Sequence, residues 1–175
     1  MSRSSLLPIL ALFLATACGG GGTLRDGTYR DGEAAYRLDP LPPDWKPISF
    51  ADNDLAWTDG GGRVISVNAV CEGHGDPSLK VLTDHLLLGF EQRHVLEREE
   101  LRLAGRGALR TRANASLDGV PVELEMTLVK KDGCVYDLIY TAPAGTFGVR
   151  AADYRRLVES FSTDVDDDGV AARRE

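Results

Sequence analysis

The sequence predicts an α+β domain in which two helices cover an antiparallel β-sheet. Three observations lead to this prediction. Apolar and polar side chains alternate along several segments, which is the period of a half-buried strand. Short turns rich in Asp and Gly separate these segments, as in antiparallel hairpins. Two further segments repeat apolar residues at helical spacing, so each would bury one face.

Composition narrows the class of protein before any motif is considered. Of 175 residues, 43% are hydrophobic and 27% are charged, which excludes a disordered chain and a polytopic membrane protein. The length suits one domain once the first residues are removed as described below. The formal net charge of −7 excludes a binding face for nucleic-acid phosphates, which needs the opposite sign.

Residues 1–17 resemble the signal peptide of a bacterial lipoprotein. Arg3 gives a short positive region, Leu6–Ala15 is apolar but too short for a permanent membrane span, and small residues precede Cys18. The resemblance implies cleavage before Cys18, acylation of its thiol and a palmitate-type membrane anchor. The alternative is an ordinary cleaved signal that leaves an unmodified cysteine.

The glycines after Cys18 predict a flexible tether. In enteric lipoproteins, an Asp directly after the lipidated cysteine is the inner-membrane retention signal. Gly19 stands at that position in this sequence, so the outer membrane is favoured, with the domain facing the periplasm. We therefore divide the chain into four parts. These are the signal peptide (1–17), the lipidated cysteine with its Gly-rich tether (18–33), the globular domain (34–162) and an acidic tail (163–175).

The first half of the domain contains three candidate strands. The first, Ala34–Leu38, leads into a proline-rich corner where Trp45 is expected to fill the edge of the core. Leu55–Trp57 and Arg63–Cys71 follow, separated by a glycine turn. The second of these alternates strictly, so one face is expected to be buried.

A helix is expected next. Asp76 suits its N-cap and Pro77 its first helical position. Leucines at helical spacing, followed by Phe90, would lay one apolar stripe on the sheet. The residues of this stripe are Leu79, Leu82, Leu86 and Phe90.

An antiparallel meander and a second helix complete the domain. The charged segment Val95–Leu103 suits an edge strand. Three more strands are expected, and in each of them alternate residues face the core. The second helix, Val149–Ser162, carries an apolar stripe on one side. The inward residues of the strands are Leu109, Thr111, Ala113 and Ala115, then Val122, Leu124, Met126 and Leu128, then Cys134, Tyr136, Leu138 and Tyr140; those of the helix are Tyr154, Leu157, Val158 and Phe161.

This order of elements resembles the PsbP-like family, over roughly Ala34–Phe161. The family includes a photosystem extrinsic protein, Ran-binding nucleotide-release factors and bacterial lipoproteins of unknown role. The resemblance implies an α-β-α sandwich and a non-enzymatic binding or assembly module, and it supplies no catalytic residues. It rests on Trp45, Gly107-Ala108-Leu109, Asp118-Gly119, Tyr136-Asp137-Leu138-Ile139-Tyr140 and Glu159-Ser160-Phe161.

Cys71 and Cys134 are expected to form a disulfide. With Cys18 acylated, these two cysteines remain in an oxidising compartment, each on the apolar face of a candidate strand. Two buried free thiols are the alternative. A zinc site of Cys71, His74 and Cys134 is the less favoured interpretation, because zinc usually takes four such ligands or three and water.

Sequence motifs for enzymes are absent from the chain. It contains no phosphate loop, dinucleotide fingerprint, nucleophile elbow or H-E-x-x-H. His74, His85 and His94 are the candidate bases near neutral pH, without a nucleophile placed beside them by any motif. We therefore expect no catalytic residues, no cofactor and no metal.

The C-terminal tail matches the spacing of a calcium-binding loop, D-x-D-x-D-G-x5-E. Arg173 and Arg174 oppose a cation there, and Glu175 lacks an exit helix to hold it. We expect a solvated acidic tail, and calcium binding is the alternative. The matching residues are Asp164, Asp166, Asp168, Gly169 and Glu175.

Two classes of function remain open. The favoured one is a non-enzymatic, membrane-anchored envelope lipoprotein that binds another envelope protein or a lipid. The other is an envelope enzyme with an unrecognised active site. A deep pocket with convergent polar groups would favour the enzyme, and a shallow apolar surface would favour the binding module.

Overall fold

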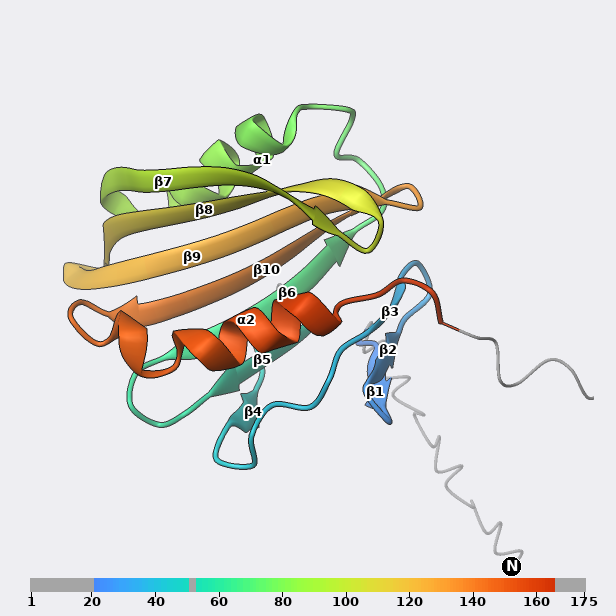
Figure 1. The fold of residues 1–175 in the computed structure, drawn as a ribbon, viewed down its shortest axis with the longest axis horizontal. Coiled ribbons are helices and arrows are strands. Elements are labelled where there is room, and N and C mark those ends of the chain that lie inside the picture. The colour runs from blue at the N-terminus through green and yellow to red at the C-terminus, as the bar shows by residue number, and fades with distance from the viewer. Residues whose placement is uncertain (1–20, 51–52, 166–175) are drawn as a thin grey trace, which may run out of the picture.

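Two antiparallel sheets organise the chain (Figure 1). The computed structural model describes residues 21–50 and 53–165. A three-stranded sheet runs in the order β1-β2-β3, and a seven-stranded sheet in the order β4-β5-β6-β10-β9-β8-β7. The large sheet consists of β4 (Lys46–Ile48), β5 (Leu55–Thr58), β6 (Val64–Val70), β7 (Glu91–Leu103), β8 (Arg106–Leu117), β9 (Val120–Lys131) and β10 (Cys134–Pro143).

The small sheet corrects the expected tether of residues 18–33. Strands β1 (Thr23–Arg25) and β2 (Thr28–Arg30) form a hairpin inside that range, and β3 (Ala35–Arg37) pairs with β2. Asp26 and Gly27, both at positive φ, form the turn. Tyr29 is buried and stacks on Tyr36, so the ordered domain starts near Thr23 and not at Ala34.

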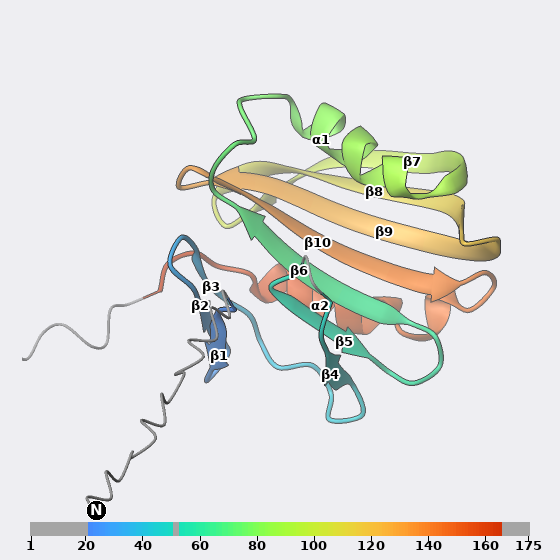
Figure 2. The same ribbon diagram turned by 180° about the vertical axis from the view of Figure 1, so that it is seen from behind.

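Two helices pack on the large sheet from opposite sides, α1 (Leu79–Leu86) over β8 and β9 and α2 (Ala151–Ser160) over β10 (Figures 1 and 2). Each side has its own apolar core. Leu82 and Leu86 pack with the β9 residues Leu124 and Met126. The residues expected on the buried stripe of the second helix all lie in the other core: Tyr154, Leu157 and Val158 on α2, and Phe161 directly after it.

The start of α1 differs from the expected one. Ser78 is the N-cap, and its Oγ accepts a hydrogen bond from the backbone N–H of Val81. Asp76 instead pairs with Lys130 on β9, at 2.7 Å. Ser and Asp are comparable N-caps, so the ion pair with the neighbouring strand decides which residue takes that position. Pro77 therefore precedes the cap.

The second helix also begins later than expected, because a 3-10 turn, η2 (Phe147–Val149), precedes it. A similar turn, η1 (Leu87–Gly89), follows α1. The edge strand β7 is longer than the segment expected from its charges, since it starts at Glu91. Its irregular pairing near Gln92 and Leu96 protects this edge from further strand pairing.

Burial of polar residues on the α2 side of β9 was not expected from the alternating pattern. Glu125 and Thr127 are fully buried. Arg155 on α2 holds the carboxylate of Glu125 through two hydrogen bonds of 3.2 and 2.9 Å. The hydroxyl of Tyr154 lies 3.0 Å from that of Thr127 and donates to the carbonyl of Leu138. Both faces of β9 are therefore covered.

Candidate functional site

A groove lies between the start of α1 and the hairpin of β7 and β8. Its volume is about 700 Å³, and its lining is mostly apolar. The groove is open to solvent along its length, unlike a closed cavity. Its lining consists of Ser78, Leu79, Lys80, Arg98, Glu100, Leu101, Arg102, Gly107, Ala108 and Leu109.

Strand register explains how this groove forms. Residues directly opposite each other in an antiparallel pair share one face of the sheet. Gly107 and Leu109 on β8 lie opposite Arg102 and Glu100 on β7. These four residues share the α1 side with Thr111, whose neighbour Met126 packs under α1. Leu109 therefore forms the floor, and β7 supplies the outer wall.

Gly107 keeps one end of the groove open. A Cβ atom added at Gly107 would meet no other atom within 4 Å. Helix α1 starts at Leu79 and is only eight residues long, so it leaves this end of the sheet uncovered. The shape of the groove therefore comes from a missing side chain and a short helix.

Charged side chains line the rim of the groove. Asp84 on α1 accepts a hydrogen bond from Lys80 at 2.8 Å through one oxygen, and from Arg98 on β7 through the other. The Lys80 ammonium is the main cause that lowers the pKa of Asp84. Glu100 and Arg102 complete the rim. Lys80, Arg98 and Arg102 thus lie at the groove with Glu100, in a chain whose net charge is −7, and the guanidinium of Arg102 donates to the carbonyl of Gly105.

Cys71 and Cys134 form the expected disulfide. The register places them together, because Val70 on β6 lies opposite Val135 on β10. The bridge joins residues 63 positions apart. Since both sulfurs are in the disulfide, they provide no thiolate for a zinc site with His74. The ring nitrogens of His74 lie 2.6 Å from the carbonyl of Gly75 and 3.0 Å from that of Gly133.

The other sites expected from the sequence are only partly described. Cys18 lies outside the described residues, as do Asp166, Asp168 and Glu175 of the calcium-loop motif. Asp164 is described, and it pairs with Lys131 at 3.1 Å. Among the described residues no group of three or more His, Cys, Asp or Glu side chains could hold a metal ion. His85 and His94 are exposed.

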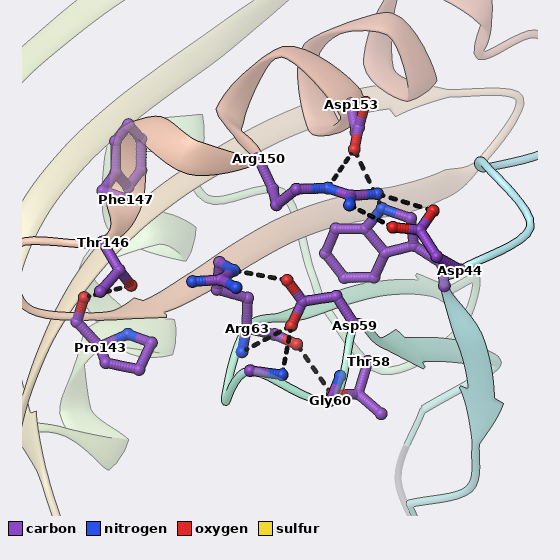
Figure 3. A network of polar contacts seen from close by, with 12 residues as sticks. Asp44, Thr58, Asp59, Gly60, Arg63, Pro143, Thr146, Phe147, Arg150 and Asp153 are labelled. Atoms are coloured by element: carbon purple, nitrogen blue, oxygen red, sulfur yellow. Dashed lines mark hydrogen bonds and ion pairs between the residues drawn. The ribbon is translucent and has the colours of Figure 1, made fainter.

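A second polar network lies at the opposite end of the sheet, on the α2 side (Figure 3). Arg150 forms a bidentate pair with Asp44 and a 2.5 Å contact with Asp153. Its guanidinium lies 5.2 Å from the ring centre of Trp45. The hydrogen bond from Arg150 lowers the pKa of Asp44. The network fixes the proline-rich corner against α2, which is a structural role.

One buried acid on the α1 side has a raised pKa. Burial raises the pKa of Asp137 on β10 to about 7, although a hydrogen bond with Asn68 opposes this effect. Asn68 on β6 is its register partner. Asp54 raises the pKa further by charge repulsion. Asp137 does not line the groove, so it belongs to the packing of the sheet.

Comparison with known proteins supports the fold. No family model matches the chain, and no curated protein matches it. Solved structures do match. Cyanobacterial PsbP (CyanoP) from Synechocystis superposes with a TM-score of 0.54 at 11% identity, over 73% of this chain and 86% of its own. The domain has a PsbP-like fold.

Two other structures agree with this result. LpqN of Mycobacterium tuberculosis, described as involved in cell envelope biogenesis, has a TM-score of 0.52 at 13% identity, over 74% of this chain and 84% of LpqN. A protein from Bacteroides thetaiotaomicron has a TM-score of 0.54 at 8% identity, over 75% of this chain and 46% of its own. These matches concern the fold alone.

The α+β class and the PsbP-like likeness expected from the sequence are therefore confirmed. The groove itself was not expected, because it depends on where a short helix starts relative to one glycine. In the part of the chain that the structure describes, no helix has the length and apolarity needed to cross a membrane.

Proposed function

We propose that this protein is a non-catalytic binding module of the bacterial envelope, with a PsbP-like α-β-α sandwich as its domain. Cys18 carries the lipid that holds it to a membrane, with the outer membrane favoured and the domain facing the periplasm. The groove between α1 and the β7–β8 hairpin is the surface that binds another envelope component.

The observation that carries this proposal is the character of the groove. Enzyme sites usually bring several polar groups together in an enclosed pocket. The groove of this domain is open and is lined mostly by apolar atoms. Leu79 and Leu109 lie in its middle, whereas its charged side chains stand along the rim. Such a surface suits the binding of an apolar ligand or an apolar segment.

Two further observations support an envelope location. A disulfide such as Cys71–Cys134 persists in oxidising compartments, which include the periplasm. LpqN, which has the same fold, is described as involved in cell envelope biogenesis. The lipoprotein-like sequence around Cys18 agrees with both.

Membrane fractionation tests the anchor. We expect the wild-type chain to remain with the envelope after a high-salt wash, and the Cys18→Ser variant to be released. Retention of the Cys18→Ser variant in the washed envelope would contradict lipid anchoring.

Site-specific photo-crosslinking tests the groove. A photoreactive residue at position 100, on the rim, is compared with one at position 114, which is exposed on the other face of the same hairpin. We expect an adduct in intact cells from position 100 and none from position 114. Equal labelling from both positions would mean that the groove is not a binding surface.

A further inference from the structure

The outward face of the three-stranded sheet carries three arginines. Residues opposite each other in an antiparallel pair share one face, and neighbours along a strand alternate between the two faces. Tyr29 and Tyr36 lie opposite each other and are buried, so they mark the inward face. The other face, which we call the arginine face, has six strand positions that hold three arginines and no acid: Thr23, Arg25, Thr28, Arg30, Ala35 and Arg37.

The arginine face is directed away from the core. On the inward side, the ring of Tyr36 packs against Tyr136 on β10 and against Phe161. Figures 1 and 2 show the small sheet at the edge of the molecule, beside the large sheet. Arg25 and Arg37 are exposed, and in the described part of the chain neither of them forms an ion pair. Their charges are therefore available to a partner outside the chain.

The acidic residues of this segment lie beside the arginine face and not on it. Asp26 is in the turn between β1 and β2, and Glu33 and Asp39 come before and after β3. Asp31 is in the turn between β2 and β3. There its Oδ1 accepts a hydrogen bond from the backbone N–H of Glu33, and its Oδ2 accepts one from the hydroxyl of Tyr29. The arginine face is thus a local concentration of positive charge in a chain whose net charge is −7.

The position of the arginine face in the chain indicates its partner. Strand β1 begins at Thr23, five positions after Cys18, so the proposed lipid is attached close to this sheet. Stable membrane attachment often combines an acyl chain with a basic patch. Anionic lipid headgroups attract arginines near the membrane surface, and a guanidinium binds a phosphate through two parallel hydrogen bonds. An anionic lipid surface therefore matches both the charge and the place of this face.

We propose that the arginine face binds the anionic headgroups of the membrane that carries the lipid anchor. Arg25, Arg30 and Arg37 bind headgroup phosphates, and the domain rests on the bilayer through its small sheet. This inference rests on the proposed membrane location, to which it adds a second contact with the bilayer. It does not involve the groove.

Vesicle sedimentation tests this contact without the anchor. The chain used is residues 18–175 with Cys18→Ser, which lacks the signal peptide and the lipid and keeps every described residue. We expect it to sediment with phosphatidylcholine vesicles that contain phosphatidylglycerol, and not with vesicles of phosphatidylcholine alone. Binding should weaken as salt is raised, because salt screens exposed charges. Equal binding to both kinds of vesicle, or binding to neither, would overturn the proposal.

Two charge-matched variants locate the contact. An arginine near an anionic surface strengthens binding by about fivefold, so we expect the double variant Arg25→Gln, Arg37→Gln to bind roughly 25-fold more weakly. Each single variant, about fivefold weaker, replaces the double variant if that one does not fold. The control, Arg93→Gln with Arg156→Gln, removes the same charge from exposed positions on β7 and α2 and should cause a much smaller loss. Equal losses in the two double variants would assign binding to net charge and overturn the proposal.

A fluorescent reporter shows which surface meets the lipid. An environment-sensitive fluorophore is attached at Thr23→Cys, on the arginine face, or at Asn114→Cys, which is exposed on β8. We expect vesicles with phosphatidylglycerol to shift the emission of the first label to shorter wavelength and to leave the second unchanged. Absence of a shift at position 23, or an equal shift at both positions, would contradict the proposed orientation.

Failure of this inference can be told apart from failure of the proposed function. If the chain binds neither kind of vesicle, the arginine face is wrong, while fractionation of Cys18→Ser still decides the anchor and crosslinking still decides the groove. If Cys18→Ser stays with the washed envelope but vesicle binding depends on Arg25 and Arg37, the lipid anchor is wrong and the arginine face stands.

Discussion

The indole Nε1 of Trp45 donates a hydrogen bond to Oδ2 of Asp153 at 3.1 Å, across 108 residues of sequence. Both side chains are buried. Asp153 lies in the first turn of α2, where a negative charge interacts favourably with the helix dipole. The contact therefore connects the proline-rich corner, the helix and the core beneath them.

Trp45→Phe is predicted to lower the free energy of unfolding. It removes the donor and leaves the buried carboxylate of Asp153 with its arginine partners only. Hydrogen bonds to charged groups contribute about 1.5–3 kcal/mol, and we expect a loss in this range by urea denaturation. Trp57→Phe, at a partly buried position against the same core, is the matched control. Equal losses in the two variants would attribute the effect to ring volume and not to the hydrogen bond.

Arg155→Met is predicted to destabilise the domain more than Arg110→Met. Arg155 holds Glu125, which is fully buried, and the remaining cation, Arg112, is 4.0 Å away. Leaving a buried carboxylate short of a partner costs about 3–5 kcal/mol in fully buried pairs. We expect about 2 kcal/mol here, because half of the Arg155 side chain is exposed.

Arg110 provides the comparison for that prediction, because both members of its pair with Glu99 are partly exposed, whereas Glu125 is fully buried. Exposed pairs contribute about 0–1 kcal/mol. Thermal or urea unfolding of both variants measures the difference. If Arg110→Met proves as costly as Arg155→Met, burial of Glu125 is not what gives its ion pair strength.

Asp137→Asn is predicted to stabilise the domain at pH 8 and to have little effect at pH 3. Burial raises the pKa of Asp137 from 3.8 to about 7 in the folded chain. As the pH rises from about 4 to 7, the unfolded chain loses this proton first, so stability falls over that range. Asparagine has no proton to lose and avoids the loss.

We expect Asp137→Asn to gain about 2 kcal/mol at pH 8, roughly half of what a full shift of three pKa units would give. Urea denaturation of wild type and variant between pH 3 and pH 8 measures it. Asp132→Asn changes an exposed acid in the turn that precedes β10 and serves as the control. A difference between wild type and Asp137→Asn that does not vary with pH would contradict the prediction.

Reduction of the Cys71–Cys134 disulfide is predicted to destabilise the domain strongly. The bridge closes a loop of 63 residues, for which the chain-entropy model gives about 4 kcal/mol. Urea denaturation with and without reductant measures the loss. The double variant Cys71→Ser, Cys134→Ser should match the reduced wild type and should not respond to reductant. A response of that variant would show that the reductant acts elsewhere.

Local patterns predicted most of the strands and both apolar stripes. The alternation of Val122, Leu124, Met126 and Leu128 is strict, so the apolar face of β9, which lies under α1, follows from the sequence alone. The pairing of Cys71 with Cys134 followed from the number of cysteines and their faces. The strand pattern depends on residues within a few positions of one another. The disulfide followed because two cysteines remained once Cys18 was assigned to the lipid.

Features that depend on packing between distant segments were not predicted. The hairpin of β1 and β2 has little apolar sequence of its own, and it is ordered because Tyr29 stacks on Tyr36. Burial of Glu125 depends on Arg155, which lies 30 residues away. The groove requires a glycine on one strand and the end of a helix beside it. None of these contacts leaves a periodic signal in the sequence.

The early start of the ordered domain limits how far it can stand from a bilayer. Thr23, the first residue of β1, follows Cys18 by five positions. Even a fully extended segment of five residues reaches only about 18 Å. With Cys18 anchored, the small sheet would lie close to the lipid headgroups.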